Sequence, residues 1–253
     1  MKKTHIKLLL NIFSLIFVCL FLFLNTGCGL ETYVVIDAPI NVSHKPVYTY
    51  EFDESYFQFT TREPSSEDAY PGYTFLGTDV YYKIYSSYST MTSECSALES
   101  IASSSTSSSN APDKLIYSYS FKKLKLSNYY GNVLIPPSEN YLPQEVEIRL
   151  SNYQNSNEYS ARIKIDGSTV GVPLRNNDSE LSFDFGRTSD NPKLNKVPVN
   201  GDEDVKYTSV SNNGEWYVAM FAIASARDAT YTTYYSNILY LGSVTIDANS
   251  YDN

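Results

Sequence analysis

The stretch Trp216-Tyr-Val-Ala-Met-Phe-Ala-Ile-Ala224 carries an apolar or aromatic side chain at every position. Successive side chains of a β-strand point to opposite faces. A strand with this sequence would therefore be apolar on both faces, which is typical of a central strand covered on both sides. We predict such a strand here. A buried helix is the alternative, because apolar runs this short do not separate the two.

Shorter runs around this stretch predict further strands. In Asp79–Tyr85, side chains of alternate residues form two sets, Val80, Tyr82 and Ile84 on one face and Tyr81, Lys83 and Tyr85 on the other. Similar alternation predicts strands at 47–52, 56–61, 117–121, 146–150, 161–165, 170–174, 181–185, 205–210 and 238–246. The pairs Asp166-Gly167 and Asn213-Gly214 predict hairpin turns. The 24 tyrosines, with many Ser and Asn residues, also favour an all-β fold.

One segment has the periodicity of a helix instead. Met91, Cys95, Leu98, Ile101 and Ala102 recur at spacings of three and four residues, which places them in one stripe. We predict a helix over 91–102 that covers the second apolar face of Trp216–Ala224. The serine-rich run 103–110 after it is expected to be a linker.

The strands at 75–85 and 216–246 resemble the third strand and the last two strands of immunoglobulin-like and fibronectin type III sandwiches. The resemblance implies an antiparallel β-sandwich over 47–248, elaborated by an insertion at about 86–204 and followed by a tail at 249–253. Two separate small domains are the alternative.

The N-terminus has the layout of a secretory signal peptide. Lys2, Lys3 and Lys7 form a basic head, and 8–24 is almost wholly apolar. This run is at the low edge of the roughly 17–25 residues that span a bilayer. An uncleaved membrane helix is therefore the alternative.

Cys28 follows the small residue Gly27 directly after the apolar run, an arrangement that resembles the lipobox of bacterial lipoproteins. Asn25 stands where that family usually has Leu, as in the looser spirochaete lipoproteins, whose Tyr-, Ser- and Asn-rich bodies are also similar. The resemblance implies cleavage between Gly27 and Cys28, lipid on the Cys28 sulfur and acylation, for example by palmitate. Residues 28–46 would then tether the domain to the membrane. An ordinary cleavage site beside an incidental cysteine is the alternative.

The net charge of the mature chain limits the classes of partner that it is expected to bind. Removal of residues 1–27 takes three lysines and no acidic residue, so the mature chain has 16 basic and 28 acidic residues and a net charge of −12. An acidic surface repels phosphates, so we expect no nucleic-acid partner. Gly29, where enterobacterial lipoproteins retained at the inner membrane have Asp, favours the outer membrane or the cell surface.

Catalytic motifs are sparse in this sequence. Its two histidines are His5, in the signal, and His44, in the tether, so a triad that uses histidine is not expected. No cofactor motif occurs either. A glycosidase remains an alternative, because it needs only two carboxylates.

Two sets of residues are candidate sites. Asn200, Asp202 and Asp204 alternate as oxygen ligands of calcium do, but the expected glycine and the bidentate glutamate are missing, so an exposed turn is the simpler interpretation. The second set is a tyrosine platform for a glycan or protein ligand: Tyr129, Tyr130, Tyr231, Tyr234 and Tyr235. Sheet-facing tyrosines are the alternative there.

Together these features predict an exported lipoprotein, held in the membrane by lipid on Cys28, with a non-enzymatic β-sandwich that binds or scaffolds. A carbohydrate-binding module or adhesin is the second hypothesis, and a glycosidase-like enzyme is the third.

The lipid prediction can be tested by mass spectrometry of the native protein. We expect the mature chain to begin at Cys28 and this residue to carry acyl chains. Two or more chains give stable membrane binding, so the protein should fractionate with membranes and Cys28→Ala should release it. A first residue elsewhere, or an unmodified Cys28 thiol, would contradict the prediction.

Overall fold

A computed structural model describes residues 35–47, 52–106, 108–127, 131, 133–151, 160–176, 181–185, 196–208 and 214–248. Its longest strand is β11 (Glu215–Asp228), which contains the stretch Trp216–Ala224. β11 pairs antiparallel with β3 (Tyr73–Tyr85) on one side. On the other side it pairs with β13 (Leu239–Asp247) and, near its C-terminal end, with β12 (Thr233–Tyr235). The prediction of a central strand is therefore confirmed, and the buried-helix alternative is wrong.

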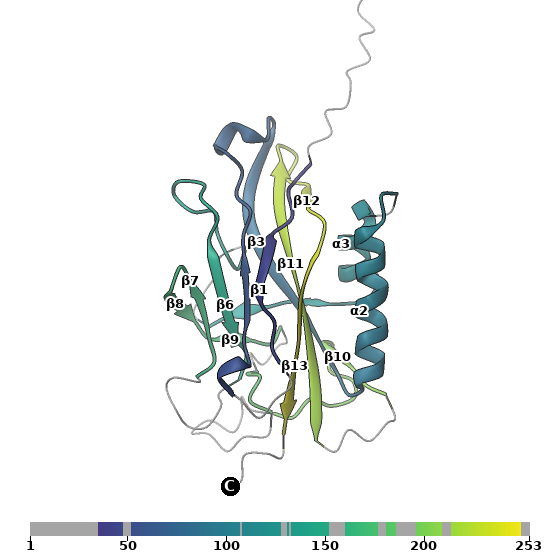
Figure 1. The fold of residues 1–253 in the computed structure, drawn as a ribbon. Coiled ribbons are helices and arrows are strands. Elements are labelled where there is room, and N and C mark those ends of the chain that lie inside the picture. The colour runs from purple at the N-terminus through teal and green to yellow at the C-terminus, as the bar shows by residue number, and fades with distance from the viewer. Residues whose placement is uncertain are drawn as a thin grey trace, which may run out of the picture. The chain divides into compact units, whose positions relative to one another are not determined.

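Two main sheets form the domain (Figure 1). The first has the order β10-β3-β11-β12, with β13 also on β11 and β4 on β3. The second is antiparallel, with the order β1-β2-β6-β7-β8. The remaining strands have these bounds: β1 Ile40–His44, β2 Phe57–Thr60, β4 Lys122–Lys123, β5 Lys125–Leu126, β6 Glu145–Arg149, β7 Arg162–Ile165, β8 Ser168–Gly171, β9 Pro173–Leu174 and β10 Val205–Lys206. β5 and β9 pair with each other as a small third sheet.

The main core lies between the two sheets. Val218, Met220 and Ala222 of β11 meet Phe57 and Ile148 of the second sheet there, and all are buried. Each large apolar side chain buried in this way contributes roughly 1.5–3 kcal/mol. The expected all-β sandwich is thus confirmed.

The other face of β11 is covered by helix α2 (Tyr88–Ser103), as predicted (Figure 1). Met91, Cys95 and Leu98 are its buried residues, and they share a second core with Phe221 and Ile223 of β11. The helix begins where the Ser87 hydroxyl accepts a hydrogen bond from the Thr90 amide, an ordinary N-cap.

Cys95, the free cysteine of the described chain, lies in this second core. Burial raises the pKa of its thiol to about 12. The thiol is therefore protonated at neutral pH and behaves as a small apolar side chain, since the thiolate is the reactive form.

Resemblance to immunoglobulin-like domains is limited to the first sheet. Those domains place their C, F and G strands side by side, and β3, β11 and β13 have the same order. Their other sheet has the order A-B-E-D, so that B adjoins the second strand of the D–E hairpin. Here β2 adjoins β6, the first strand of the β6-β7-β8 meander. The range 86–204, expected as an insertion, thus supplies three strands of the second sheet.

Several predictions for single elements were wrong. Ala111 and Leu115, four residues apart, are buried against α2, so 111–118 forms α3 (Ala111–Asp113) and a π-helical turn (Lys114–Ser118) instead of the start of a strand at 117–121. Phe183 and Phe185 fill the main core from a loop without strand pairing. β1 lies within the range 28–46 that we expected to be a tether, because its backbone pairs with β2.

The strands expected to flank a hairpin at Asn213-Gly214 are not neighbours in the described part of the chain. β10 pairs parallel with β3 on the far side from β13, so it is not the neighbour of β11. By contrast, Asp166 and Gly167 have φ of 48° and 77° and join β7 to β8, as expected for a type I′ turn.

A buried ion pair holds β10 in this position. Arg175 is fully buried, and its Nε and Nη2 donate to the two carboxylate oxygens of Asp204 over 2.8 and 2.7 Å. The Tyr82 hydroxyl of β3 donates to Asp204 over 2.7 Å. The backbone carbonyl of Asp204 accepts a hydrogen bond from the amide of Ile84, which also belongs to β3. The chain therefore reaches β3 one residue before β10 begins.

Asp204→Ala should destabilise the protein strongly, because it leaves the Arg175 guanidinium buried without its main partner. Loss of one partner of a buried pair costs about 3–5 kcal/mol. Urea denaturation measures the change in the free energy of unfolding.

Glu203→Ala is the matched control. Glu203 is exposed and pairs with Lys122 at the surface, so its loss should change the free energy of unfolding by less than about 1 kcal/mol. Equal effects of the two substitutions would contradict the role given to Asp204.

Candidate functional site

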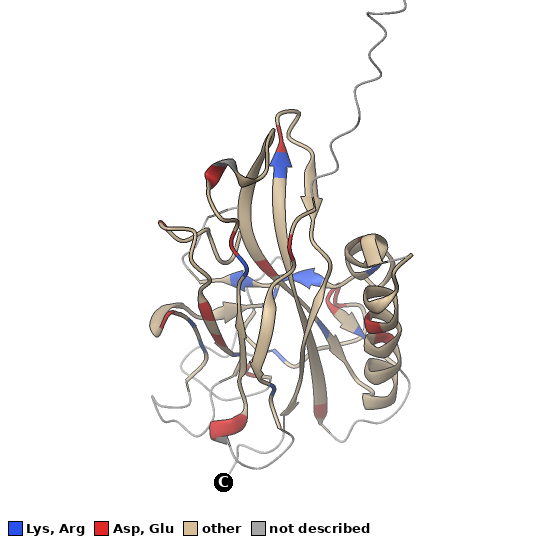
Figure 2. Ribbon diagram, turned by 45° about the horizontal axis from the view of Figure 1, so that its top comes forward, with Lys and Arg blue, Asp and Glu red and all other residues tan. Residues whose placement is uncertain are grey.

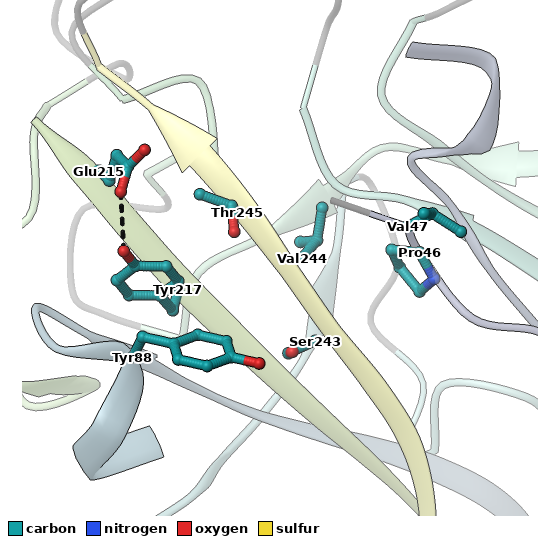
Figure 3. A pocket seen from close by; sticks show the side chains of 8 residues that line it. All are labelled: Pro46, Val47, Tyr88, Glu215, Tyr217, Ser243, Val244 and Thr245. Carbon is teal, nitrogen blue, oxygen red and sulfur yellow. Dashed lines mark hydrogen bonds between the residues drawn. The ribbon is translucent and has the colours of Figure 1, made fainter. Parts of the chain in front are cut away.

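A pocket of about 480 Å³ opens beside the N-terminal end of β11 (Figure 3). Its volume is in the range of small-molecule sites, roughly 300–1,000 Å³. Four parts of the chain contribute its lining: the segment after β1, the first residue of α2, the start of β11 and the middle of β13. The lining residues are Pro46, Val47, Tyr88, Glu215, Tyr217, Ser243, Val244 and Thr245.

Two tyrosine rings form one wall of the pocket. Tyr88 is the first residue of α2 and is 59% exposed. Its ring meets that of Tyr217 edge to face, with centroids 5.5 Å apart and an interplanar angle of 63°. Such pairs hold each other at a defined angle. The wall is therefore formed before any ligand arrives.

A carboxylate lies next to this wall. Glu215 and Tyr217 are two residues apart on β11, so the pleat places them on the same face. The Tyr217 hydroxyl donates to Glu215 Oε2 over 2.8 Å (Figure 3). This bond holds the carboxyl group of Glu215 against the tyrosine wall of the pocket.

β13 adds two hydroxyls on the same face. In the register of β11 and β13, Thr245 lies opposite Tyr217 and Ser243 lies opposite Ala219. Val244, between them, points to the other face and is buried in the main core. The pocket thus combines aromatic faces with a carboxylate and hydroxyls, groups that bind a polar ligand that also has an apolar face.

The tyrosine platform predicted from the sequence is only partly assembled. Tyr231 is 80% exposed in the turn between β11 and β12, and Tyr234, in β12, is 40% exposed. Tyr235 instead packs on the second core and is hydrogen-bonded to Tyr81. Tyr129 and Tyr130 lie outside the described residues, as do Gly27 and Cys28.

Asp228 organises this turn. Its Oδ1 accepts hydrogen bonds from the amides of Thr230 and Thr232, over 2.8 and 2.9 Å, and from the Thr230 hydroxyl. The bond from Thr230 is the main cause that lowers the pKa of Asp228. Tyr231, enclosed by these bonds, has φ of 67°, a conformation that side chains larger than glycine rarely adopt.

The candidate calcium ligands have another partner. Arg175 Nη2 donates to Asp202 Oδ2 over 2.9 Å, in addition to its bonds with Asp204. Asn200 is exposed at the adjoining turn. In the described part of the chain, no group of three or more His, Cys, Asp or Glu residues is placed to hold a metal ion. The alternating acids thus neutralise an arginine of the same chain.

Charged residues are distributed over both sheets and the helix layer (Figure 2). Several basic residues pair with acids, including Lys83 with Glu94 at 2.9 Å and Lys123 with Asp79 at 2.8 Å. Burial lowers the pKa of Lys83 and raises the pKa of Asp79, and it is the main cause of both shifts. These pairs tie β3 to α2 and to β4.

The pocket was not among the candidate sites from the sequence, although one of its residues, Tyr88, belongs to a tyrosine-rich stretch with Tyr81, Tyr82 and Tyr85. Tyr88 and Tyr217 lie more than a hundred positions apart, and only the docking of α2 on β11 brings them together. The one local signal is Glu215-Trp-Tyr217, where an acid and a tyrosine share a face at the start of the central strand.

Comparison with known proteins gives no match: no family model, no curated protein and no solved structure is similar to this chain. Among the described residues, no helix is long and apolar enough to cross a bilayer.

Proposed function

We propose that this chain is an exported, lipid-anchored protein whose β-sandwich binds a saccharide in the pocket between α2 and β13. The observation that carries the proposal is the wall of Tyr88 and Tyr217 beside the fixed carboxylate of Glu215. The anchor is the lipid expected on Cys28.

A sugar ring matches the chemistry of this pocket. One face of a pyranose presents C–H groups, which pack on aromatic rings, while its edge presents hydroxyls. Tyr88 offers an exposed ring face, and Glu215 offers a carboxyl group beside it for hydrogen bonds with sugar hydroxyls. Ser243 and Thr245 supply further hydroxyls on β13. A tyrosine gives contact area and a polar tip together, as sugar binding requires.

The lining supports binding more than hydrolysis. Glycosidases place two carboxyl groups about 5–9.5 Å apart around the scissile bond. Glu215 is the single acidic residue among those that line the described pocket, and one of its oxygens is bonded to Tyr217. Nothing in the described residues indicates an enzymatic activity.

Anchoring agrees with the position of the first strand. β1 begins at Ile40, so eleven residues lie between this strand and Cys28, where the lipid is expected. The net charge of −12 expected for the mature chain would keep the domain off an anionic surface while the lipid holds it nearby. An outer leaflet, facing environmental or host glycans, is the placement we propose.

Tyr88→Ala should weaken binding of the best ligand found on a glycan array by about tenfold. This corresponds to roughly 1.4 kcal/mol, near the upper end of what an aromatic contact contributes. Titration calorimetry with the purified domain measures the change in Kd.

Tyr117→Ala is the matched control, because Tyr117 is 71% exposed in the π-helical turn and does not line the pocket. It should bind the glycan like the wild type. Both variants should keep the wild-type Tm, since both side chains are exposed. Absence of any glycan ligand, or equal binding by the Tyr88 and Tyr117 variants, would contradict the proposal.

A further inference from the structure

The two candidate surfaces of the domain lie at opposite ends of β11. Glu215 is the first residue of this strand and lines the pocket. Asp228 is its last residue and leads into the turn that contains Tyr231. Thirteen residue steps of about 3.3 Å place them roughly 40 Å apart. A surface that held one end of the domain would therefore leave the other end far from it.

The described chain begins at the Asp228 end (Figure 1). Asp37 Oδ2 lies 3.5 Å from Arg62 Nε in the loop between β2 and β3, and the Tyr70 hydroxyl of that loop bonds to the Asp37 backbone. The loop leads into Tyr73, which pairs with Asp228 and whose ring meets Tyr234 at 5.1 Å. The first described residue, Val35, therefore lies at the same end of the domain as the turn that contains Tyr231.

The expected lipid is only a short reach from this end. Cys28 and Val35 are seven residues apart, and seven residues span at most about 25 Å when fully extended. This is well short of the length of β11. A lipid on Cys28 thus keeps the Asp228 end within reach of the bilayer.

The turn at this end displays a tyrosine. Tyr231 is 80% exposed, and the bonds of Asp228 to Thr230 and Thr232 hold it at φ of 67°. Strained residues persist only where their surroundings fix them. The Arg227 guanidinium lies over the Tyr231 ring, 5.9 Å from its centre. Val35, 77% exposed, is a second apolar side chain at this end.

We propose that Tyr231 rests in the headgroup layer of the bilayer that carries the Cys28 lipid, so that the pocket of Tyr88 points away from the membrane. Tyrosine is enriched at this depth because its ring is apolar and its hydroxyl is polar. This end carries charges of both signs, because Asp37 pairs with Arg62, and Asp228 of the turn is preceded by Arg227, whose guanidinium lies beside the Tyr231 ring. The surface that fits this end is therefore a zwitterionic one. The inference rests on the lipid anchor of the proposed function.

Fluorescence quenching by brominated phosphatidylcholine tests this orientation. The chain has one tryptophan, Trp216, which is buried at the pocket end and 4% exposed. A tryptophan is added by Tyr231→Trp or, as the matched control, by Tyr88→Trp, and each lipidated protein is reconstituted into the vesicles. We expect the added fluorescence to be quenched in the Tyr231→Trp protein and to remain in the Tyr88→Trp protein.

Equal quenching at the two positions, or quenching at Tyr88→Trp alone, would overturn the orientation. Failure of the anchor is seen separately, because the protein would then not sediment with the vesicles. In that case, coupling of a maleimide phospholipid to Cys28 supplies the anchor, and the same comparison of the two tryptophans decides the orientation. Loss of glycan binding in the Tyr231→Trp protein, without lipid quenching, would instead assign the turn to a glycan.

Discussion

Burial of both faces of β11 is the constraint on which the rest of this structure depends. A strand with apolar side chains at every position cannot leave either face in water, so one sheet must carry a second layer on each side. The second sheet covers the face of Val218 and Met220, and α2 covers the face of Phe221 and Ile223. The helix is thus a structural layer that the sequence of the central strand requires.

The pocket is a consequence of this three-layer arrangement. Where α2 begins, its first residue meets the first residues of β11, and β13 borders the same gap. Tyr88 and Tyr217 together line this gap. The opposite end of β11 leads into a turn that Asp228 organises by hydrogen bonds.

Sequence reasoning predicted the elements whose pattern is local. Trp216–Ala224 shows its double burial, Met91 to Leu98 shows a helical stripe, and Asp166-Gly167 shows its turn. It did not predict pairings that depend on distant residues. Nothing near Asp204 indicates that Arg175, 29 positions earlier, would neutralise it and direct β10 to β3. The helical form of 111–118 likewise depends on the packing of Ala111 and Leu115 beside α2, which overrides the β-propensity of Tyr117. The pocket also depends on contacts between residues that are distant in the sequence, and it was therefore not predicted.

Hydrogen exchange of the backbone amides tests the central role of β11 most directly. Amides at the centre of a structure exchange only through global unfolding. The amides of 217–223 should be among the slowest in the domain, and their exchange rates should follow the global free energy of unfolding. Exchange in this stretch as fast as in β8, at the edge of the second sheet, would contradict it.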